Sequence, residues 1–526
     1  MKASIWNAVF VVAGFLTMCA AVAAEGDSGL PATAGKVAPP EPFGPVPSAR
    51  QLKWHEMGMY AFCHFGVDTF TGAEWGSGGE QPEIFHPAEF DGNQIAGAIK
   101  AGGFKGIILT CKHHDGFCLW PTKSTPHNIS ASPYKNGKGD IVREMAEACR
   151  QADIKFGVYV SPWDRNHPEY GQPGYVKVYH QQIKELLTGY GPLFEIWFDG
   201  ANGGDGYYGG AGGTRKIQAA TYYDWDTIWD MVRLYQPQAI IYSDVGPDIR
   251  WVGNESGYAQ DPCWTTYTPH VRDFQPVKTG SPLSRFDAWG FVNYPEGEHG
   301  HRDGRYWLPA EVDVSIRPGW FWHQEQNPQV RSPENLMQIY LASVGLGQGM
   351  NLNVPPNRRG LVDDNDVASL KAFGEHLRQT FAENLAQGAV LAASEVRGGD
   401  ADTYGPQKLL DGDPWSAWIT NDHWTSHAAS VEITLAGEKT FNLIRLREDV
   451  RLGQRVEQAA VDVWDTQAKG GEGDWKELAR AESIGACRLW RVPETTTSRL
   501  RLRVVKSPVA PALSDFGLYR EPASVP

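Results

Sequence analysis

The 526 residues exceed the length of one ordinary domain, so two or three domains are expected. Hydrophobic residues make up 41% and charged residues 21% of the chain, a composition typical of a soluble globular protein and not of a disordered one. The net charge is −14 and no basic cluster stands out, which argues against nucleic acid as a partner.

The first 24 residues have the pattern of a secretory signal peptide. Lys2 supplies the positive end, residues 8–24 are mostly apolar and small, and Ala21 to Ala24 offer a small-residue cleavage site. The apolar stretch breaks at Glu25, too early for a membrane anchor, and no later segment is long and apolar enough to span a bilayer. We therefore expect an exported protein, periplasmic or secreted. Residues 25–47, rich in Pro, Gly and Ala, are expected to form a linker.

Six cysteines follow the signal peptide, and their spacing matches no metal-binding motif. Several lie in apolar runs, where a free buried thiol is the commoner outcome. The sequence itself does not pair them into disulfides. They are Cys63, Cys111, Cys118, Cys149, Cys263 and Cys487.

Short apolar runs then alternate with helix-like stretches. Strands are expected over 59–66, 106–110, 156–160, 194–198, 239–242, 312–316 and 349–354, and helices over 93–101, 141–152, 176–187, 222–235, 334–346 and 367–387. Repeated strand–helix units predict a parallel sheet. No Gly-x-Gly-x-x-Gly follows the first strand and no phosphate-binding loop is present, so a nucleotide-binding fold lacks its signature. We predict an α/β fold, a (β/α)8-like barrel over residues 48–387, with about seven recognisable strands and an irregular closure.

Polar and aromatic residues gather just after these strands. The carboxyl ends of the strands of a parallel barrel share one face, so we expect the following residues to converge there. Any one of them alone would fit a buried histidine or a packing tryptophan, but six sets together predict an active site. The sets are His64 with Glu74 and Trp75; His113 and His114; Trp163 and Asp164; Asp199; Asp244; and Trp320.

Asp199 ends the most apolar of these runs, residues 194–198, and a glycine-rich loop follows it. An aspartate that only caps a turn before Gly200 is the alternative interpretation. Two carboxylates suffice to cleave a glycosidic bond, one as nucleophile or base and the other as proton donor to the leaving oxygen, and Asp199 is the natural nucleophile. Composition and spacing leave its partner open among Asp244, Asp248, Glu255, Glu296, Glu298 and Glu311.

After residue 387 the pattern changes to short alternating runs separated by turn residues. The runs are 429–435, 441–446, 460–463 and 500–505. This pattern predicts an all-β sandwich over residues 388–526.

Motifs along residues 45–385 resemble those of the family 29 glycoside hydrolases, the retaining α-L-fucosidases. They are His64-Phe65-Gly66 with Thr69-Phe70, Glu74-Trp75-Gly76, Lys112-His113-His114-Asp115-Gly116-Phe117, Trp197-Phe198-Asp199-Gly200, Ser315-Ile316-Arg317-Pro318-Gly319-Trp320-Phe321 and Asn351-Leu352-Asn353-Val354-Pro355-Pro356.

The resemblance implies that Asp199 is the nucleophile of a covalent fucosyl intermediate. The segment ending in Gly253-Asn254-Glu255 is similar to the subgroup that prefers α-1,3- and α-1,4-linked branches of Lewis-type glycans, in which this glutamate is the acid/base. Burial and the charge of Asp199 would both raise the pKa of Glu255, as an acid requires. No cofactor or metal is needed for this route, and the expected partners are fucosylated oligosaccharides or glycoconjugates.

The resemblance also implies which side chains hold the sugar. Trp197 and Trp320 would line the pocket around the fucose methyl group. The residues implied to contact the fucose hydroxyls are His64, Glu74, Trp75, His113, His114 and Tyr159. Hydroxyls need donors and acceptors, and a methyl group needs an aromatic wall, so these residue types suit the sugar.

Motifs in the last 140 residues or so resemble a discoidin-like (coagulation factor 5/8 type C) domain, a fold that includes carbohydrate-binding modules. They are Leu409-Leu410-Asp411-Gly412-Asp413 with Trp418, Arg445-Leu446-Arg447-Glu448, Gly453-Gln454-Arg455-Val456, Trp475 and Ser514-Asp515-Phe516-Gly517-Leu518-Tyr519. The motifs leave two interpretations of this domain open, a purely structural one and a sugar-binding one. Related domains often hold a structural calcium ion, for which Asp411 and Asp413 are the candidates.

Two alternatives to an exo-acting fucosidase remain open. One is a non-catalytic, lectin-like protein that binds fucose or galactose, against which the presence of Asp199 together with a candidate acid argues. The other is a related glycosidase for another sugar, since fucose is itself a 6-deoxygalactose.

Overall fold

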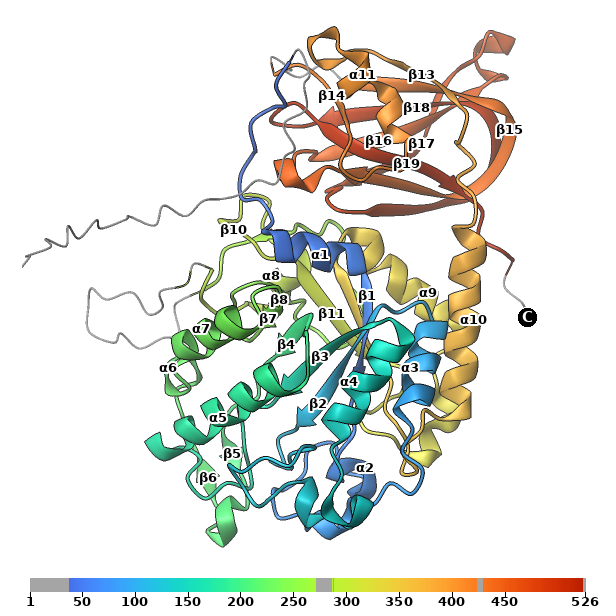
Figure 1. Ribbon diagram of the computed structural model, residues 1–526. Helices are drawn as coiled ribbons and strands as arrows, with labels where there is room; N and C mark the ends of the chain where they lie inside the picture. Colours follow the sequence, from blue (N-terminus) through green and yellow to red (C-terminus); the bar gives the residue numbers. More distant parts are fainter. Residues whose placement is uncertain (1–36, 271–285, 287, 423–428, 524–526) are drawn as a thin grey trace, which may run out of the picture.

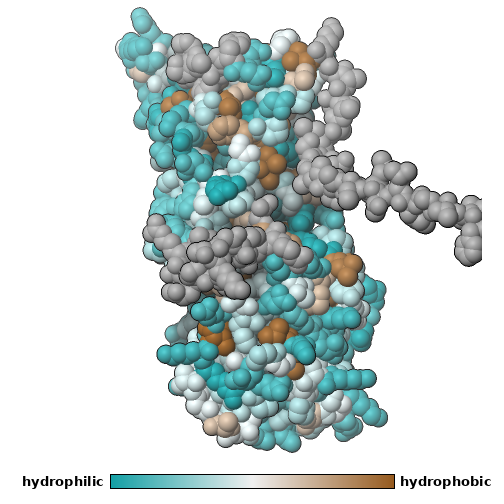
Figure 2. Space-filling model, turned by 90° about the vertical axis from the view of Figure 1, so that its left-hand side faces the viewer, coloured by the Kyte–Doolittle hydropathy of each residue, from teal (hydrophilic) through white to brown (hydrophobic). Residues whose placement is uncertain are grey.

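The computed structural model describes residues 37–270, 286, 288–422 and 429–523 (Figure 1). The expected signal peptide and the first part of the expected linker lie outside the described residues. Two lobes follow one another along the chain, an α/β barrel and a β domain (Figure 1). The face in Figure 2 is mainly hydrophilic, with hydrophobic residues scattered over it rather than gathered into one patch.

Eight parallel strands build the barrel in the order β7-β4-β3-β2-β1-β12-β11-β8. The strands are β1 (Met59–Cys63), β2 (Gly106–Lys112), β3 (Lys155–Val160), β4 (Glu195–Trp197), β7 (Ile240–Tyr242), β8 (Arg250–Trp251), β11 (Ala310–Ser315) and β12 (Gly349–Asn353). Among the described residues no ladder joins β7 to β8, so the barrel is nearly closed. The predicted (β/α)8-like fold is confirmed.

Helices cover the outside of the barrel (Figure 1). They are α3 (Gly92–Ala101), α4 (Ile141–Ala152), α5 (Pro173–Gly189), α7 (Trp225–Tyr235), α9 (Pro333–Leu341) and α10 (Asp364–Thr380). Shorter elements are α1 (Ala49–Met57), α2 (Val67–Thr71), α6 (Ala219–Tyr222), α8 (Tyr294–His299), β5 (Gly204–Asp205), β6 (Thr214–Arg215), β9 (Thr266–Tyr267) and β10 (Tyr306–Trp307).

Helix caps explain where the structure departs from the predicted bounds. The predicted helix 222–235 is divided, because Asp224 has a left-handed φ of 54° and α7 begins after it. The predicted helix 367–387 begins earlier, since the Asp363 side chain accepts from the Asn365 amide and caps α10. It also ends at Thr380, after which the chain turns toward the β domain.

The barrel strands are buried on both faces, as expected for a parallel sheet covered by helices. Successive residues of each strand point to opposite faces, so they pack into two separate hydrophobic cores. One set, including Ile107, Leu109 and Ile196, packs under the helices. The other set fills the barrel interior with Trp54, Tyr60, Phe62, Ile108, Tyr159, Trp197, Ile240, Tyr242 and Ile249.

The β domain is a single antiparallel sheet of seven strands that bends over its own core. Its strands are β13 (Val390–Ala393), β14 (Trp418–Ile419), β15 (Ala429–Glu448), β16 (Gln458–Asp465), β17 (Asp474–Glu482), β18 (Arg488–Lys506) and β19 (Ala512–Tyr519), and α11 (Ala401–Tyr404) precedes β14. The pairing of β15 with β18 shifts register between Thr434 and Lys439, where these long strands bend. The all-β prediction is confirmed.

The β domain sits at the amino ends of the barrel strands (Figure 1). Leu489 of β18 packs against Gly345 and Leu341, which precede β12, and Gln454 accepts from the amide of Thr265 at 3.0 Å. The carboxyl ends of the strands therefore face away from this domain.

Residues 37–47, expected to be part of a linker, run along the β domain. Tyr404 donates to the Val37 carbonyl at 2.9 Å, and Arg397 donates to that of Ala38 at 2.8 Å. This segment therefore ties the start of the barrel to the β domain.

The six described cysteines are all buried and form no disulfide. Among the described helices, none has the length and apolar run that a bilayer crossing requires.

Candidate active site

Asp199 lies two residues beyond the carboxyl end of β4. Its Oδ1 accepts from the amide of Ala201 at 2.7 Å, so one oxygen does cap the turn. The other, Oδ2, accepts from the hydroxyl of Tyr159 at 2.9 Å, and the side chain keeps 23% of its surface exposed. Burial raises the pKa of Asp199 above its ordinary value, and these bonds together with His113 limit the rise. One carboxylate oxygen is thus held by a phenol at an accessible position.

His64 is fixed by Asn353 at the end of β12. The Asn353 amide nitrogen donates to the Trp320 carbonyl at 2.7 Å, which orients its oxygen toward His64. That oxygen lies 2.9 Å from Nδ1 of His64, so Nδ1 carries the hydrogen and Nε2 keeps a lone pair. Burial and His113 hold the pKa of His64 well below its usual range, so the ring is neutral.

His114 is oriented in a similar way by Ser161. The Ser161 hydroxyl donates to the Trp163 carbonyl at 2.8 Å, so it accepts from Nδ1 of His114 at 2.7 Å. Nε2 of His114 then carries a lone pair and lies 4.0 Å from Oδ2 of Asp199. Burial lowers the pKa of His114 well below its usual range. A sugar hydroxyl could therefore donate to this nitrogen.

An aromatic stack lies under Asp199. Trp197 stacks between Tyr159, at 5.2 Å, and Tyr242, at 4.0 Å. Its indole nitrogen donates to Glu311 at 2.7 Å inside the barrel, and only 5% of the residue is exposed. Trp197 thus supports Tyr159 from within the barrel and offers little surface of its own.

Trp320 contacts three other residues expected at the site. Its amide donates to Glu74 at 2.7 Å, its indole nitrogen donates to Glu255 at 3.2 Å, and its ring lies 5.0 Å from that of His64. Trp75 stands at the mouth, 54% exposed, with its ring edge-on to His114 at 5.1 Å. The ten residues expected at the site, from His64 to Trp320, therefore gather at the carboxyl ends of the strands.

The charge of Asp199 raises the pKa of two of its six candidate partners. Burial raises the pKa of Glu255, and Asp199 and Glu74 add to the rise, while the bond from Trp320 opposes it. Burial and Asp199 raise the pKa of Asp244 to about 7, and Asp244 lies beside Gly200. Asp244 can therefore keep a proton near neutral pH, and Glu255 keeps its proton to a higher pH than an ordinary glutamate.

The other candidates have partners elsewhere. Asp248 binds Arg233 at 2.6 Å and the Ile241 amide at 2.8 Å. Glu311 lies in the barrel interior, bonded to Trp197 and Tyr60. Glu298 accepts from the side chains of Asn254 and Gln260, and Glu296 accepts from two histidines.

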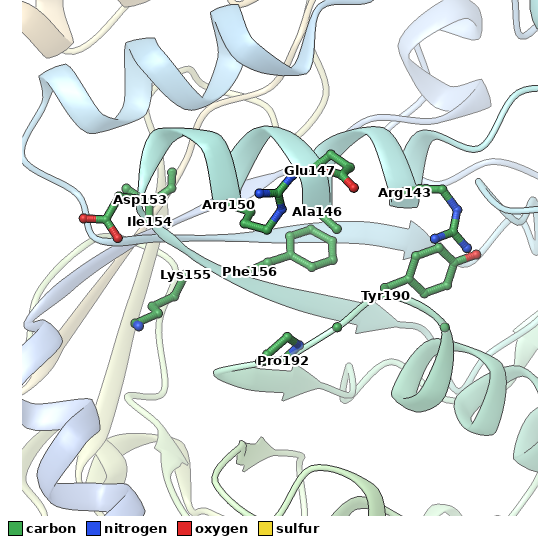
Figure 3. A pocket seen from close by; sticks show the side chains of 12 residues that line it. Arg143, Ala146, Glu147, Arg150, Asp153, Ile154, Lys155, Phe156, Tyr190 and Pro192 are labelled. Carbon is green, nitrogen blue, oxygen red and sulfur yellow. Dashed lines mark hydrogen bonds and ion pairs between the residues drawn. The ribbon is translucent and has the colours of Figure 1, made fainter.

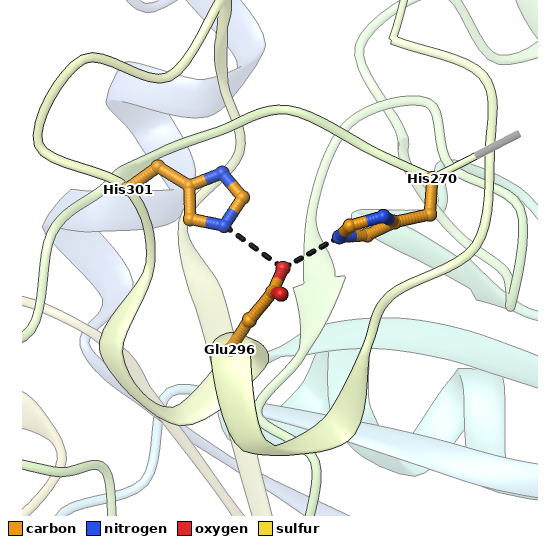
Figure 4. Close-up of side chains that lie close together, drawn as sticks. All are labelled: His270, Glu296 and His301. Carbon is orange, nitrogen blue, oxygen red and sulfur yellow. Dashed lines mark hydrogen bonds and ion pairs between the residues drawn. The ribbon is translucent and has the colours of Figure 1, made fainter.

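Those two histidines, His270 and His301, form a cluster with Glu296 that has a zinc-type donor set (Figure 4). The Thr268 amide donates to Nδ1 of His301 at 3.1 Å, so Nε2 of that ring carries the hydrogen and donates to Glu296 at 3.1 Å. A metal would need that nitrogen's lone pair. The three side chains therefore form a hydrogen-bonded group in which Nε2 of His301 has no lone pair left for a metal.

The expected calcium candidates also bond within their own turn. Asp411 accepts from the Asp413 amide at 3.0 Å and from the Ser416 hydroxyl at 2.6 Å, and Asp413 accepts from the Trp415 amide at 2.9 Å. These bonds engage the two side chains within their own turn, and calcium binding there stays a prediction.

A groove of about 400 Å³ lies at the other end of the barrel, between α4 and the segment before β4 (Figure 3). Its arginines pair with acids of their own helix region, Arg150 with Glu147 and Arg143 with Asp140. It gives no indication of a second site.

Three supporting residues were not singled out from the sequence. Asn353 orients His64, Ser161 orients His114, and His323 contacts Glu74 at 3.0 Å. Asn353 ends β12, and Ser161 and His323 follow β3 and β11, at the same edge as the expected residues, and this position was the available signal.

Comparisons with known proteins show the family of the chain. The α-L-fucosidase family model matches residues 47–381. Alpha-L-fucosidase 1 of Arabidopsis thaliana is 36% identical over 487 residues, 92% of this chain and 89% of that protein. A glycoside hydrolase 29 family member from an unknown rumen bacterium is 38% identical, with a TM-score of 0.78 over 92% of this chain and 79% of that one.

A GH29 fucosidase from Ruminococcus gnavus, solved in complex with fucose, is 29% identical. Its TM-score is 0.81, and the match covers 93% of this chain and 98% of that one. The matches extend through both lobes, and the family model covers most of the barrel. The chain therefore belongs to the α-L-fucosidase family, family 29 of the glycoside hydrolases.

Proposed function

We propose that this chain is a retaining exo-α-L-fucosidase with Asp199 as nucleophile and Glu255 as acid/base. The observation that carries the proposal is an accessible carboxyl, Asp199, whose charge raises the pKa of a second carboxyl, Glu255, at a rim lined by neutral imidazoles. The lone pairs of His64 and His114 suit sugar hydroxyls, and the ring of Trp320 suits a methyl group.

In the first half-reaction, the Asp199 carboxylate attacks the anomeric carbon while Glu255 gives its proton to the leaving oxygen. The bond to the leaving sugar breaks as the bond to Asp199 forms. Asp199 then carries no charge, so the repulsion that raised the pKa of Glu255 weakens. Glu255 can now accept a proton from water, whose oxygen attacks the same carbon and releases Asp199 as a carboxylate.

The lectin-like alternative uses the same pocket without turnover. It is less well supported, because a binding site has no need of an accessible carboxylate whose charge raises the pKa of a second carboxyl. Fucose released by the unmodified protein from any fucoside would exclude it. A glycosidase for another sugar would instead hydrolyse a galactoside or a related glycoside faster than the fucoside.

We also propose a preference for α-1,3- and α-1,4-linked branches of Lewis-type glycans, supported by the sequence around Glu255. Free fucose is expected at least about tenfold faster from a Lewis-type trisaccharide than from 2'-fucosylated lactose, since each missing contact to the neighbouring sugar costs about 1.4 kcal/mol or more. An aryl fucoside serves as the control for general activity. Equal rates on both oligosaccharides would keep the fucosidase and remove the preference.

Export is a further proposal, based on residues 1–24. Expression with its own leader in a bacterium is expected to give a mature chain that begins near Glu25 and lies outside the cytoplasm. N-terminal mass analysis of fractionated cells checks this. An intact Met1 in the cytoplasmic fraction would contradict it.

A further inference from the structure

Beside the proposed pocket, three ionisable side chains form a buried group. Asp68 lies on α2, and His113 and Asp115 follow β2. Their relative exposures are 0%, 7% and 2%, and one side-chain ligand atom of each lies within 4.8 Å of the other two. None of the roles proposed for the pocket so far uses Asp68 or Asp115.

The hydrogen bonds of this group are incomplete. Asp68 accepts from the Gly76 amide at 3.0 Å, and Asp115 accepts from the Phe117 amide at 2.6 Å. Among the described residues, Oδ1 of Asp68 and Nδ1 of His113 have no hydrogen-bond partner. Nδ1 of His113 lies 3.5 Å from Oδ2 of Asp68, the oxygen that also accepts from Gly76, so the carboxylate of Asp68 is within reach of the unpartnered nitrogen.

The backbone of Gly76 packs closely against both acidic residues. A methyl group on Gly76 would come within 2.5 Å of Oδ1 of Asp68 and 2.8 Å of Cβ of Asp115. The two carboxyls are thus pressed together beneath a glycine backbone. Two carboxylates this close, away from water, cannot both stay ionised, so one keeps a proton.

The proton belongs on Asp115. Burial and the charge of Asp68 raise the pKa of Asp115 well above its ordinary value, and Glu80 and Asp164 act in the same direction. The group then carries one negative charge, on Asp68, facing His113.

The neighbouring histidines show what such an acceptor does. His64 and His114 each have Nδ1 against an oxygen of a supporting residue, which leaves Nε2 with a lone pair. His113 belongs to the same row, with its ring 4.1 Å from His114 and stacked at 5.8 Å on Tyr159. Its Nδ1 faces Asp68.

We propose that Asp68 is a positioning residue: its carboxylate holds the hydrogen of His113 on Nδ1 and so leaves Nε2 to accept a fucose hydroxyl. This inference rests on the proposed function. A neutral amide at position 68 would hold that hydrogen less firmly, since charged acceptors form the stronger bonds.

The two carboxyls should therefore respond differently to the same change. Asp115→Asn copies the protonated acid in shape and can donate to Asp68, so kcat/KM on an aryl α-L-fucoside is expected to fall only a few-fold. Asp68→Asn removes the charge and is expected to lower kcat/KM about tenfold or more, mainly through KM. Glu375→Gln, half-exposed on α10, is the matched control for loss of one charge.

A set of 2-, 3- and 4-deoxy aryl fucosides separates positioning from general damage. The loss caused by Asp68→Asn should disappear with the one substrate that lacks the hydroxyl bound by His113. Equal losses on every substrate, or equal losses for the two Asn variants, would overturn the inference. Loss of wild-type activity with a chelator, restored by a divalent metal, would replace it with a metal site.

The tautomer of His113 can be measured in the wild-type protein, which keeps the inference testable should Asp68→Asn fail to fold. With 15N-labelled histidine, the signals missing in His113→Gln identify His113. A protonated Nδ1 and an unprotonated Nε2 are expected, and the reverse would overturn the inference. If this tautomer is found but the wild type releases no fucose, the proposed function fails. Asp68 would then still position His113, in a site that binds the sugar without hydrolysing its glycosidic bond.

Discussion

Replacing Asp199 by Ala is expected to reduce fucose release from an aryl α-L-fucoside by a factor on the order of 10⁴ to 10⁶. The variant loses the oxygen that would bond to the anomeric carbon, and no other described carboxylate shares its position between Tyr159 and His114. The fold should survive, because the main cost is two hydrogen bonds, from the amide of Ala201 and the hydroxyl of Tyr159. Steady-state kinetics with a nitrophenyl fucoside measures the loss.

Azide makes this test specific for a retaining enzyme. It can enter the space left by the side chain and attack the anomeric carbon directly, so the variant should recover activity and form the β-fucosyl azide. Asp205→Asn, on the glycine-rich loop that follows Asp199, is the matched control and should keep wild-type activity. Substantial activity of Asp199→Ala without azide would show that another group is the nucleophile.

The periodicity of the sequence predicted most strands of the barrel, and the failure to predict β8 has a physical cause. Strand β8 was missed because it has two residues and begins with an arginine. Arg250 is buried there, yet its guanidinium donates to the carbonyls of Gly297 and Trp264 at 3.0 and 2.9 Å. Such compensation depends on segments far along the chain and leaves no local pattern.

The site was predictable in part for a different reason. Parallel strands bring their carboxyl ends together, so residues that follow the strands could be grouped before any geometry was known. The choice among six carboxyls could not be made in this way. It depends on which of them are neutralised by partners, as Asp248 is by Arg233, and which remain within the field of Asp199.

Trp197 shows the same limit on a smaller scale. The sequence places it next to the nucleophile, whereas the alternation of the strand turns its side chain into the barrel against Glu311. Its exposed surface is small, and its contact with the site passes through Tyr159.

The second large effect is expected at Glu255. Activity should rise with pH as Asp199 ionises, and fall again as Glu255 loses the proton that the leaving oxygen needs. Both pKa values are raised, so both limbs should lie above the ordinary range of the two carboxyls. Glu255→Gln cannot ionise, so the falling limb should disappear, and a pH–rate profile of kcat/KM checks this.

The leaving group decides whether Glu255 is the proton donor. An oligosaccharide needs protonation to leave, so Glu255→Gln should lose about 10² to 10⁴ in rate on it. A dinitrophenyl fucoside needs almost none, so formation of its intermediate should be nearly as fast as in the wild type. Azide should then speed the second half-reaction and give the α-fucosyl azide, opposite to the product of Asp199→Ala.

Asp244 is the competing assignment, because its pKa of about 7 also suits an acid. If Asp244 were the donor, Asp244→Asn and not Glu255→Gln would show the dependence on the leaving group and the loss of the falling limb. We expect Asp244→Asn to act otherwise. The charge of Asp199 raises the pKa of Asp244, so Asp244 is still neutral at the pH where Asp199 ionises, and a neutral Asn in its place should leave both limbs of the profile where they are in the wild type. The two variants thus separate a group that gives up a proton in the reaction from one that only titrates in the field of the nucleophile.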